Sequence, residues 1–513
     1  MRHRISFLFI FSLFLILNSH CAKKQNIQSL LRIALEDEVQ TLDPQAQNES
    51  VSWSVLGNIF EGLVAFDRNM KIIPSLAESW ENPDEFTWRF RLRKGVRFHN
   101  GKEFKAEDVV YTLRRAKTYS ASKIKSYLIA LDSLKVLDDW TVELITKRSY
   151  PVLLNKLTFV FVLPAPGVSK DKEDESIAQP IGTGPYCFIE WKKGQVVKLV
   201  ANENYWNSKP TISEVWFMAI PDDYQRVQAL LNGSVDLIRE AEESEVTRLR
   251  QTKGIKVICK PGLSVTYLGF NVKKLPFKNK RIRQAVSLAL DREDIITRHI
   301  FGEALLAGGP LSQNVFGFNP KWSNPIKKNF ERANQLLESA GFPKGFSVTL
   351  DVVHTAKDIA ETIKEQLRKL KIEIKIKLWD WTELYPRLCR GESDFFLTGW
   401  GCSSGDASDL FDDCVHTADT KRGYGEANHG GYSNQKLDKL IEESSTILDS
   451  SLRLEKLQQI VDLFMEELPL IPLYMRNNIY AFSERPRPLG QNKIIWEPRQ
   501  DRRVYAAEIG VKQ

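Results

Sequence analysis

The chain has 513 residues, of which 42% are hydrophobic and 27% are charged. This composition is typical of a folded globular protein and excludes an extended disordered chain, while the length is too great for a single hydrophobic core. The net charge of +7 is small for such a length, so we expect no nucleic-acid partner.

The first 21 residues have the pattern of an export signal. Arg2 and Arg4 precede residues 5–17, which are apolar except for two serines. This run is too short to span a bilayer comfortably but suits the core of a signal peptide. Cys21 follows it and resembles the cysteine that receives the lipid in bacterial lipoproteins, although Asn18 and His20 depart from the usual pattern. We expect export to the periplasm or the outer face of the cytoplasmic membrane, with lipidation at Cys21; the alternative is an ordinary cysteine near a conventional cleavage site.

Five further cysteines are Cys187, Cys259, Cys389, Cys402 and Cys414. An odd number leaves at least one of them unpaired within a single chain. A Cys402–Cys414 disulfide is one interpretation in an oxidising compartment, and buried free thiols are the other.

Strand and helix patterns alternate along the chain, which predicts an α/β fold. The strands are predicted from alternating or short apolar runs, and the helices from apolar residues at helical spacing. The predicted strands cover residues 29–35, 87–92, 371–377 and 394–397; the predicted helices begin at residue 105 or cover residues 282–290, 359–370 and 451–465.

Ten short motifs occur in an order that resembles one family. They are 42–44 (LDP), 59–63 (IFEGL), 74–80 (PSLAESW), 92–104 (LRKGVRFHNGKEF), 182–186 (GTGPY), 202–206 (NENYW), 269–271 (GFN), 283–285 (RQA), 336–342 (LLESAGF) and 469–474 (PLIPLY). Each is weak alone, but together and in this order they resemble the bacterial extracellular solute-binding proteins of the peptide/nickel class, family 5.

The resemblance implies a two-lobed periplasmic-binding-protein fold of type II, similar to the large cluster C, with an extra inserted subdomain. It divides the chain into a signal peptide (1–21), a first segment of lobe I (22–56), the inserted subdomain (57–188), a second segment of lobe I (189–272), lobe II (273–478) and a last segment of lobe I (479–513). The implied function is the substrate-binding component of an ABC importer, a monomer that passes a peptide or glutathione-like ligand to the membrane permease. No cofactor and no protein-bound metal are implied.

The loop after the strand at 394–397 is the expected ligand site. In the family such a loop lines the cleft with a tryptophan, and an aspartate three residues later pairs with the ligand's ammonium group. Here Ser403 stands in the aspartate's position, so Asp406 is the expected carboxylate, with a turn or helix cap as its alternative role and Asp409 as a second choice. The expected ligand-binding residues are Asn48, Gly399, Trp400, Ser403, Ser404 and Asp406.

A positive group for a ligand carboxylate is harder to find. His354 or Lys357 takes this role in one interpretation, and a solvated surface position is the other. Trp379 and Trp381 line the cleft in one interpretation and belong to the core in the other.

Two other functions are compatible with parts of the sequence. Residues 401–405 satisfy the G-x-S-x-G pattern of serine hydrolases, with Ser403 as nucleophile and His416 or His429 downstream, but too little chain separates them for the fold that this motif requires. We therefore expect no enzyme. The seven histidines show no metal-ligand spacing, but a nickel chelate or haem requires none, so a receptor for such a ligand remains the alternative.

Overall fold

The computed structural model describes residues 29–166, 180–484 and 493–512. The predicted signal peptide and Cys21 lie outside these residues. Within them, no helix is both long and apolar enough to cross a membrane.

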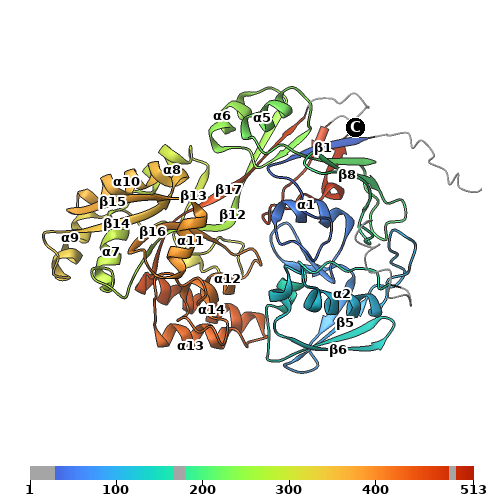
Figure 1. Ribbon diagram of the computed structural model, residues 1–513, viewed down its shortest axis with the longest axis horizontal. Coiled ribbons are helices and arrows are strands. Elements are labelled where there is room, and N and C mark those ends of the chain that lie inside the picture. The colour runs from blue at the N-terminus through green and yellow to red at the C-terminus, as the bar shows by residue number, and fades with distance from the viewer. Residues whose placement is uncertain (1–28, 167–179, 485–492, 513) are drawn as a thin grey trace, which may run out of the picture.

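One sheet of eleven strands extends through the whole molecule (Figure 1). Its order is β15-β14-β16-β12-β17-β11-β1-β10-β9-β8, and β13 adds to β17. The strands are β1 (Leu30–Leu35), β8 (Tyr186–Lys192), β9 (Val196–Ala201), β10 (Glu214–Ala219), β11 (Leu237–Arg239), β12 (Ile255–Phe270), β13 (Ala304–Leu306), β14 (Phe346–Val353), β15 (Ile372–Trp379), β16 (Phe395–Gly401) and β17 (Leu470–Ser483).

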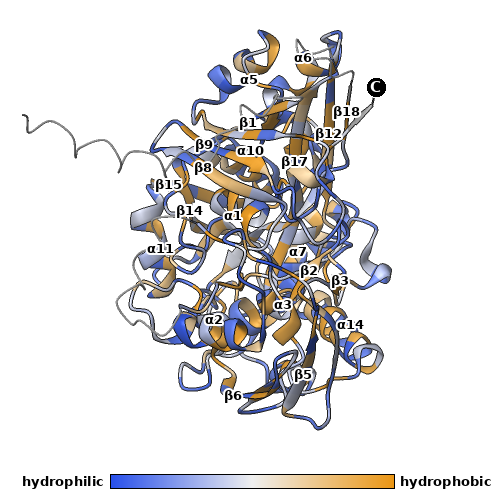
Figure 2. Ribbon diagram, turned by 90° about the vertical axis from the view of Figure 1, so that its right-hand side faces the viewer, coloured by the Kyte–Doolittle hydropathy of each residue, from blue (hydrophilic) through white to orange (hydrophobic). Residues whose placement is uncertain are grey.

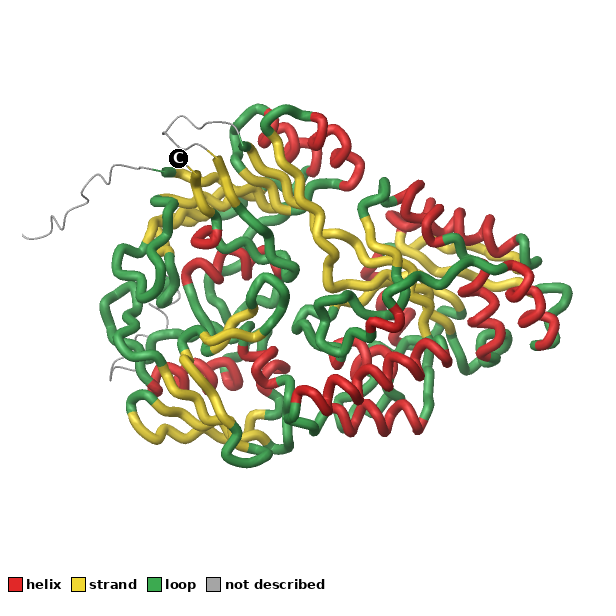
Figure 3. Tube along the Cα trace, turned by 180° about the vertical axis from the view of Figure 1, so that it is seen from behind, coloured by secondary structure: helices red, strands yellow, loops and turns green. Residues whose placement is uncertain are grey.

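The antiparallel strands β12 and β17 connect the two halves of the molecule, and Figure 3 shows them passing from one half to the other. Their register is interrupted between Pro261, which faces Asn477, and Val265, which faces Met475. Proline has no N–H to donate, which suits an irregular point in a ladder. We call residues 265–475 lobe II and the other described residues lobe I. The sequence-based divisions after residues 21, 56, 188, 272 and 478 remain predictions.

Lobe I combines its part of the large sheet with a smaller antiparallel sheet of order β4-β5-β7-β6. The additional elements of lobe I are α1 (Ser50–Ile59), β2 (Val64–Phe66), β3 (Ile72–Pro74), β4 (Ala77–Glu81), β5 (Thr87–Leu92), α2 (Ala106–Thr118), β6 (Leu131–Asp138), β7 (Thr141–Thr146), α3 (Leu153–Leu157), α5 (Asp223–Leu231), α6 (Val246–Gln251), β18 (Lys493–Ile495) and β19 (Gly510–Lys512).

Lobe II packs its helices on the other end of the large sheet. They are α7 (Lys280–Ala289), α8 (Arg292–His299), α9 (Phe330–Ser339), α10 (Lys357–Arg368), α11 (Trp381–Cys389), α12 (Ser408–Leu410), α13 (Gln435–Ser444) and α14 (Ser450–Glu467). The buried clusters of lobe II are separate from those of lobe I. In Figure 2, many of the packed strands are hydrophobic, whereas much of the outer loops is hydrophilic. Each lobe therefore has its own core.

The predicted α/β class is confirmed, as are the predicted strands and helices. The strand expected at 87–92 is β5, and the helix expected at 359–370 is α10, which begins and ends two residues earlier. Lys371 follows this helix with φ +60°. This left-handed conformation cannot continue a helix, so the chain turns there and β15 begins at Ile372.

Three of the sequence motifs meet at one side chain. The carboxylate of Glu61, from IFEGL, accepts hydrogen bonds from Thr183 Oγ1, Tyr205 Oη and Trp206 Nε1, each at 2.8 Å. Thr183 belongs to GTGPY, and the two aromatic residues belong to NENYW. These motifs therefore join segments of lobe I that lie more than 100 residues apart in the sequence.

Of the two interpretations of Cys402 and Cys414, free thiols are confirmed and the disulfide is wrong. All five cysteines among the described residues are free, and both Cys402 and Cys414 are buried. Burial raises the pKa of each of these two thiols well above its ordinary value. They therefore behave as small apolar core residues, in line with the alternative interpretation.

We predict that Glu61→Ala lowers the free energy of unfolding by about 2–3 kcal/mol, because it leaves three hydrogen-bond donors without their acceptor. Glu61→Gln keeps one acceptor oxygen, so its loss should be smaller. Urea unfolding followed by circular dichroism measures both. Glu78→Ala, at an exposed position of the PSLAESW motif, is the control and should change stability by less than about 0.5 kcal/mol. Equal stability of Glu61→Ala and the parent would contradict the joining role of Glu61.

Candidate functional site

A cavity of about 370 Å³ lies where the two lobes and the connecting strands meet. Lobe II supplies Gly401 and Ser403. The lobe I parts of the connecting strands supply Gly262, Leu263 and Ser264 from β12 and Arg476, Asn477 and Asn478 from β17. The remaining lining residues also come from lobe I: Asn48, Ser50, Trp53, Phe159, Glu240, Glu243, Gln500, Asp501, Arg502 and Arg503. Such a mixture of aromatic, amide and charged side chains suits a small polar ligand.

A second cavity of about 280 Å³ is lined only by lobe I residues, among them Glu61, Trp206 and Arg499. A movement of lobe II would not close it. The cavity between the lobes is therefore the better candidate for a ligand that is enclosed when the lobes approach each other.

Two of the six expected ligand-binding residues line the cavity between the lobes. Asn48 is exposed just before α1, and Ser403 is exposed at the tip of the loop after β16. The structure thus brings together residues that are 355 positions apart in the sequence. Gly399, Trp400 and Ser404 are not among the lining residues.

Asp409 holds the loop around Ser403 in place. Its Oδ2 accepts a hydrogen bond from the Ser404 backbone N–H at 2.8 Å, and its carbonyl oxygen accepts one from Trp400 Nε1. The Cys402 N–H also donates to the Leu263 carbonyl at 3.0 Å, which fixes the loop to β12. Trp400 and Asp409 thus stabilise the loop, and Ser403 lines the cavity.

Asp406 lies inside lobe II, not at the cavity. It is 1% exposed and receives two hydrogen bonds from Arg453, at 2.6 and 2.8 Å, and one from the Ser408 N–H at 2.9 Å. Burial favours the neutral acid, but the Arg453 guanidinium outweighs it and lowers the pKa of Asp406. Both oxygens are engaged within the lobe, which argues against the expected role in binding a ligand amine and favours the alternative of a structural turn.

Lys156 from α3 of lobe I contacts the same loop of lobe II. Its Nζ lies 2.8 Å from Asp409 Oδ1, and the neighbouring Asn155 donates to the Ser404 carbonyl at 2.8 Å. Burial alone would lower the pKa of Lys156, but the charge of Asp409 and the hydrogen bond to it outweigh burial and raise that pKa. A lysine of the protein thus already occupies Asp409, the second-choice carboxylate for a ligand amine.

The other candidate side chains also lie away from the cavity. His354 and Lys357 are exposed next to the start of α10, as the surface alternative expects. Trp379 donates to Asp351 Oδ1 at 2.9 Å and packs beside the lobe II core, while Trp381 is 50% exposed. Neither tryptophan is among the residues that line the cavity.

The arrangement around Ser403 is not that of a serine hydrolase. His416 is buried, lies 3.0 Å from Glu442 and stacks on Tyr424, and His429 packs against aromatic rings. His416 is hydrogen-bonded to the Thr417 carbonyl and Glu442, and His429 contacts Tyr385 and Phe396, so neither imidazole is placed to act on Ser403. Across residues 29–166, 180–484 and 493–512, no cluster of three or more metal-ligating side chains occurs.

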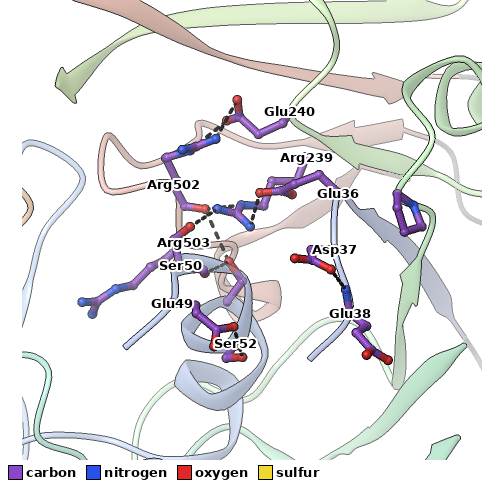
Figure 4. A network of polar contacts seen from close by, with 12 residues as sticks. Glu36, Asp37, Glu38, Glu49, Ser50, Ser52, Arg239, Glu240, Arg502 and Arg503 are labelled. Carbon is purple, nitrogen blue, oxygen red and sulfur yellow. Dashed lines mark hydrogen bonds and ion pairs between the residues drawn. The ribbon is translucent and has the colours of Figure 1, made fainter. Parts of the chain in front are cut away.

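Sequence reasoning missed the lobe I wall, which is formed by Trp53 and residues 500–503. A partly buried ionic network stabilises this wall (Figure 4). Arg239 is fully buried, contacts Glu36 at 2.8 Å and donates to the Arg502 carbonyl at 2.8 Å, while Arg502 pairs with Glu240 at 2.9 Å. The only signal in the sequence is the polar run Arg499-Gln500-Asp501-Arg502-Arg503, which follows no known motif.

Comparison with protein families gives one match. Residues 71–422 match the model described as bacterial extracellular solute-binding proteins, family 5 Middle. The match covers more than half of the chain.

Curated relatives and solved structures cover most of the chain. The oligopeptide-binding protein AppA of Bacillus subtilis is 29% identical over 85% of this chain and 84% of its own. Heme-binding protein A of Haemophilus influenzae is 27% identical over 81% of each chain. DppA of Helicobacter pylori, solved with the peptide STSA, has a TM-score of 0.72 and 25% identity, and covers 95% of this chain and 99% of its own. HbpA2 of Haemophilus parasuis has a TM-score of 0.83 and 24% identity, with 94% and 100% covered.

We predict that the carboxyl of Asp412, in the short helical segment Phe411–Val415 of lobe II, makes stability fall as the pH rises. Burial, and then the charges of Asp413 and Asp406, raise the pKa of Asp412 to about 8. The folded state thus retains a proton that the unfolded chain loses near pH 4, and it loses stability from there up to about pH 8. Asp412→Asn has no carboxyl to titrate and should therefore remove this loss.

Urea unfolding at pH 4, 6 and 8 tests this prediction. Asp412→Asn should gain stability relative to the parent as the pH rises. The exposed Asp132 in β6 offers the control, since Asp132→Asn should follow the parent at every pH. Parallel curves for Asp412→Asn and the parent would show that Asp412 ionises normally.

Proposed function

Because the chain belongs to family 5 of the bacterial extracellular solute-binding proteins, we propose that it captures a peptide or glutathione-like solute between its lobes for an ABC importer. A protein of this family binds its solute and carries out no enzymatic reaction on it. The observation that carries the proposal is the cavity of about 370 Å³ to which both lobes and the connecting strands contribute. A ligand there contacts both walls, so its binding favours the state in which the lobes are together.

The relatives support a peptide-like ligand. AppA is named an oligopeptide-binding protein, and GsiB of Pectobacterium atrosepticum, 26% identical over 88% of this chain and 90% of its own, is named a glutathione-binding protein. The polar lining of the cavity, with Asn48, Ser403 and residues 500–503, matches the many amide and charged groups of such solutes.

A haem or metal-chelate receptor is the second candidate. Heme-binding protein A is a relative at 27% identity. The aromatic side chains Trp53 and Phe159 in the lining are the feature of the cavity that favours a flat, partly apolar ligand.

Mass spectrometry of small molecules released from purified residues 22–513 distinguishes the candidates. We predict an intact peptide or glutathione that rebinds in calorimetry with micromolar or tighter affinity. Release of haem or a nickel chelate would replace the peptide proposal with the second candidate. Fragments of an added peptide would contradict a receptor altogether.

Ser403→Trp should weaken ligand binding at least tenfold, because it fills the cavity from the lobe II side without burying a new charge. Its thermal midpoint should stay close to that of the parent, since Ser403 is exposed. His354→Trp introduces the same side chain at an exposed position away from the cavity and should bind like the parent. Unchanged affinity of Ser403→Trp would exclude this cavity as the binding site.

We also propose that the chain is exported as a monomer and anchored through a lipid on Cys21, which places the receptor beside its permease. Labelling of cells with a radioactive fatty acid should mark the protein, and Cys21→Ser should abolish the label and release the protein from the membrane fraction. A label that persists in Cys21→Ser would contradict lipidation at this residue.

A further inference from the structure

Four polar atoms in the lobe I wall of the cavity have no hydrogen-bond partner. They are Trp53 Nε1, Gln500 Oε1, Asp501 Oδ2 and Arg503 Nη2. All four residues line the cavity between the lobes. Buried polar atoms are rarely left without a partner in folded proteins, so a group of four beside one cavity calls for an explanation.

The Arg503 side chain is held in place by two aromatic rings and by weak hydrogen bonds of Nη1. It is 3% exposed, and its guanidinium lies 5.3 Å from the centre of the Trp53 ring and 4.5 Å from that of Phe159. Nη1 donates weakly to the Thr158 carbonyl and the Tyr505 hydroxyl, both at 3.4 Å. Figure 4 shows the Arg503 side chain extending away from the network of Arg239 and its partners. Nη2 is therefore a fixed donor without an acceptor.

Acceptors without donors lie on the same wall. Gln500 is 2% exposed, and its Nε2 donates to Ser312 Oγ of lobe II at 3.2 Å, which leaves Oε1 unbonded. Asp501 Oδ2 lies 3.5 Å from Arg503 Nε, close enough for an ion pair but without hydrogen-bond geometry. The wall thus offers two N–H donor groups and two oxygen acceptors.

The four other charged groups of the cavity form two ion pairs. Glu240 pairs with Arg502 at 2.9 Å, and Glu243 pairs with Arg476 at 3.0 Å. They define the shape and charge of the cavity but have their own partners. The unbonded set is therefore specific to Trp53, Gln500, Asp501 and Arg503.

We propose that this set recognises a carboxylate together with a nearby N–H group of the same solute. The carboxylate accepts hydrogen bonds from Arg503 Nη2 and Trp53 Nε1, as a charge-assisted pair that an arginine held by aromatic rings favours. The N–H group, an amide or an ammonium, donates to Gln500 Oε1 and Asp501 Oδ2. This inference rests on the proposed function and narrows it to solutes that carry both groups, such as the end of a peptide; a haem propionate supplies only the carboxylate.

Calorimetry with paired ligands tests the proposal on the protein as it is. The probes are glutathione, tri- and tetrapeptides with a free carboxyl end, the same peptides as carboxyl-terminal amides, haem and haem dimethyl ester. We expect the free-acid peptide to bind at least tenfold more tightly than its amide. Among the variants, Arg503→Gln and Trp53→Phe should each reduce affinity for the free acid about tenfold or more, and should remove its advantage over the amide.

Trp53→Phe is the more conservative variant, because it keeps an aromatic ring beside Arg503 and removes only the N–H donor. Arg476→Gln is the matched control: it changes an arginine of the same cavity whose guanidinium is paired with Glu243, and the preference for the free acid should persist. If Arg503→Gln fails to fold, the comparison of free-acid and amide peptides in the parent and in Trp53→Phe still tests whether a ligand carboxylate is recognised.

The outcomes separate this inference from the proposed function. If the parent binds free-acid peptides and their amides equally well, the proposed carboxylate recognition by Arg503 and Trp53 is wrong, while the proposal of a peptide receptor stands. Haem that binds more tightly than every peptide and more tightly than its dimethyl ester would overturn both the N–H requirement and the peptide proposal. A parent protein that binds none of the probes would contradict both the proposed function and the proposed carboxylate recognition.

Discussion

The architecture depends on the pairing of β12 with β17. These two strands belong to one ladder, yet each enters both lobes, so every approach of the lobes must deform this pair. Its register shifts between Pro261 and Val265, and again between Thr266 and Tyr267. The residues beside the first of these shifts, Gly262, Ser264 and Asn477 among them, also line the cavity. The irregular part of the connection between the lobes therefore borders the cavity proposed for the ligand, and binding there would be coupled to closure of the lobes.

The sequence motifs form the scaffold around this strand pair, whereas the lobe I wall of the cavity is formed by residues outside the motifs. Glu61, Thr183 and the NENYW aromatics join segments of lobe I, and Asp406 pairs with Arg453 inside lobe II. Asp409 is used by Lys156 across the lobes. Asp406 and Asp409, the two carboxylates expected to bind a ligand amine, are thus already paired with Arg453 and Lys156 of the protein itself. The unbonded polar atoms beside the cavity belong instead to Trp53, Gln500, Asp501 and Arg503.

Local patterns predicted local structure well. The alternation at 87–92 and the helical spacing at 282–290 depend on neighbouring residues, and β5 and α7 follow them closely. The site required contacts that no local pattern carries. Arg453, which occupies Asp406, lies 47 positions away, and the bond that joins Gln500 to Ser312 spans 188 positions. Asn48 and Ser403 were identified because the family resemblance supplied the long-range arrangement; the run at 499–503 has no such motif, and only the folded chain brings it next to Trp53.

The most direct measurement of the central claim is a crystal structure of the protein with the solute that it retains on purification. The account predicts electron density for the solute in the cavity between the lobes, in contact with Ser403 on one side and with Arg503 and Trp53 on the other. Density in the second cavity of lobe I, or on a surface that only one lobe forms, would contradict it, because binding there would leave the β12–β17 connection without a part in capture.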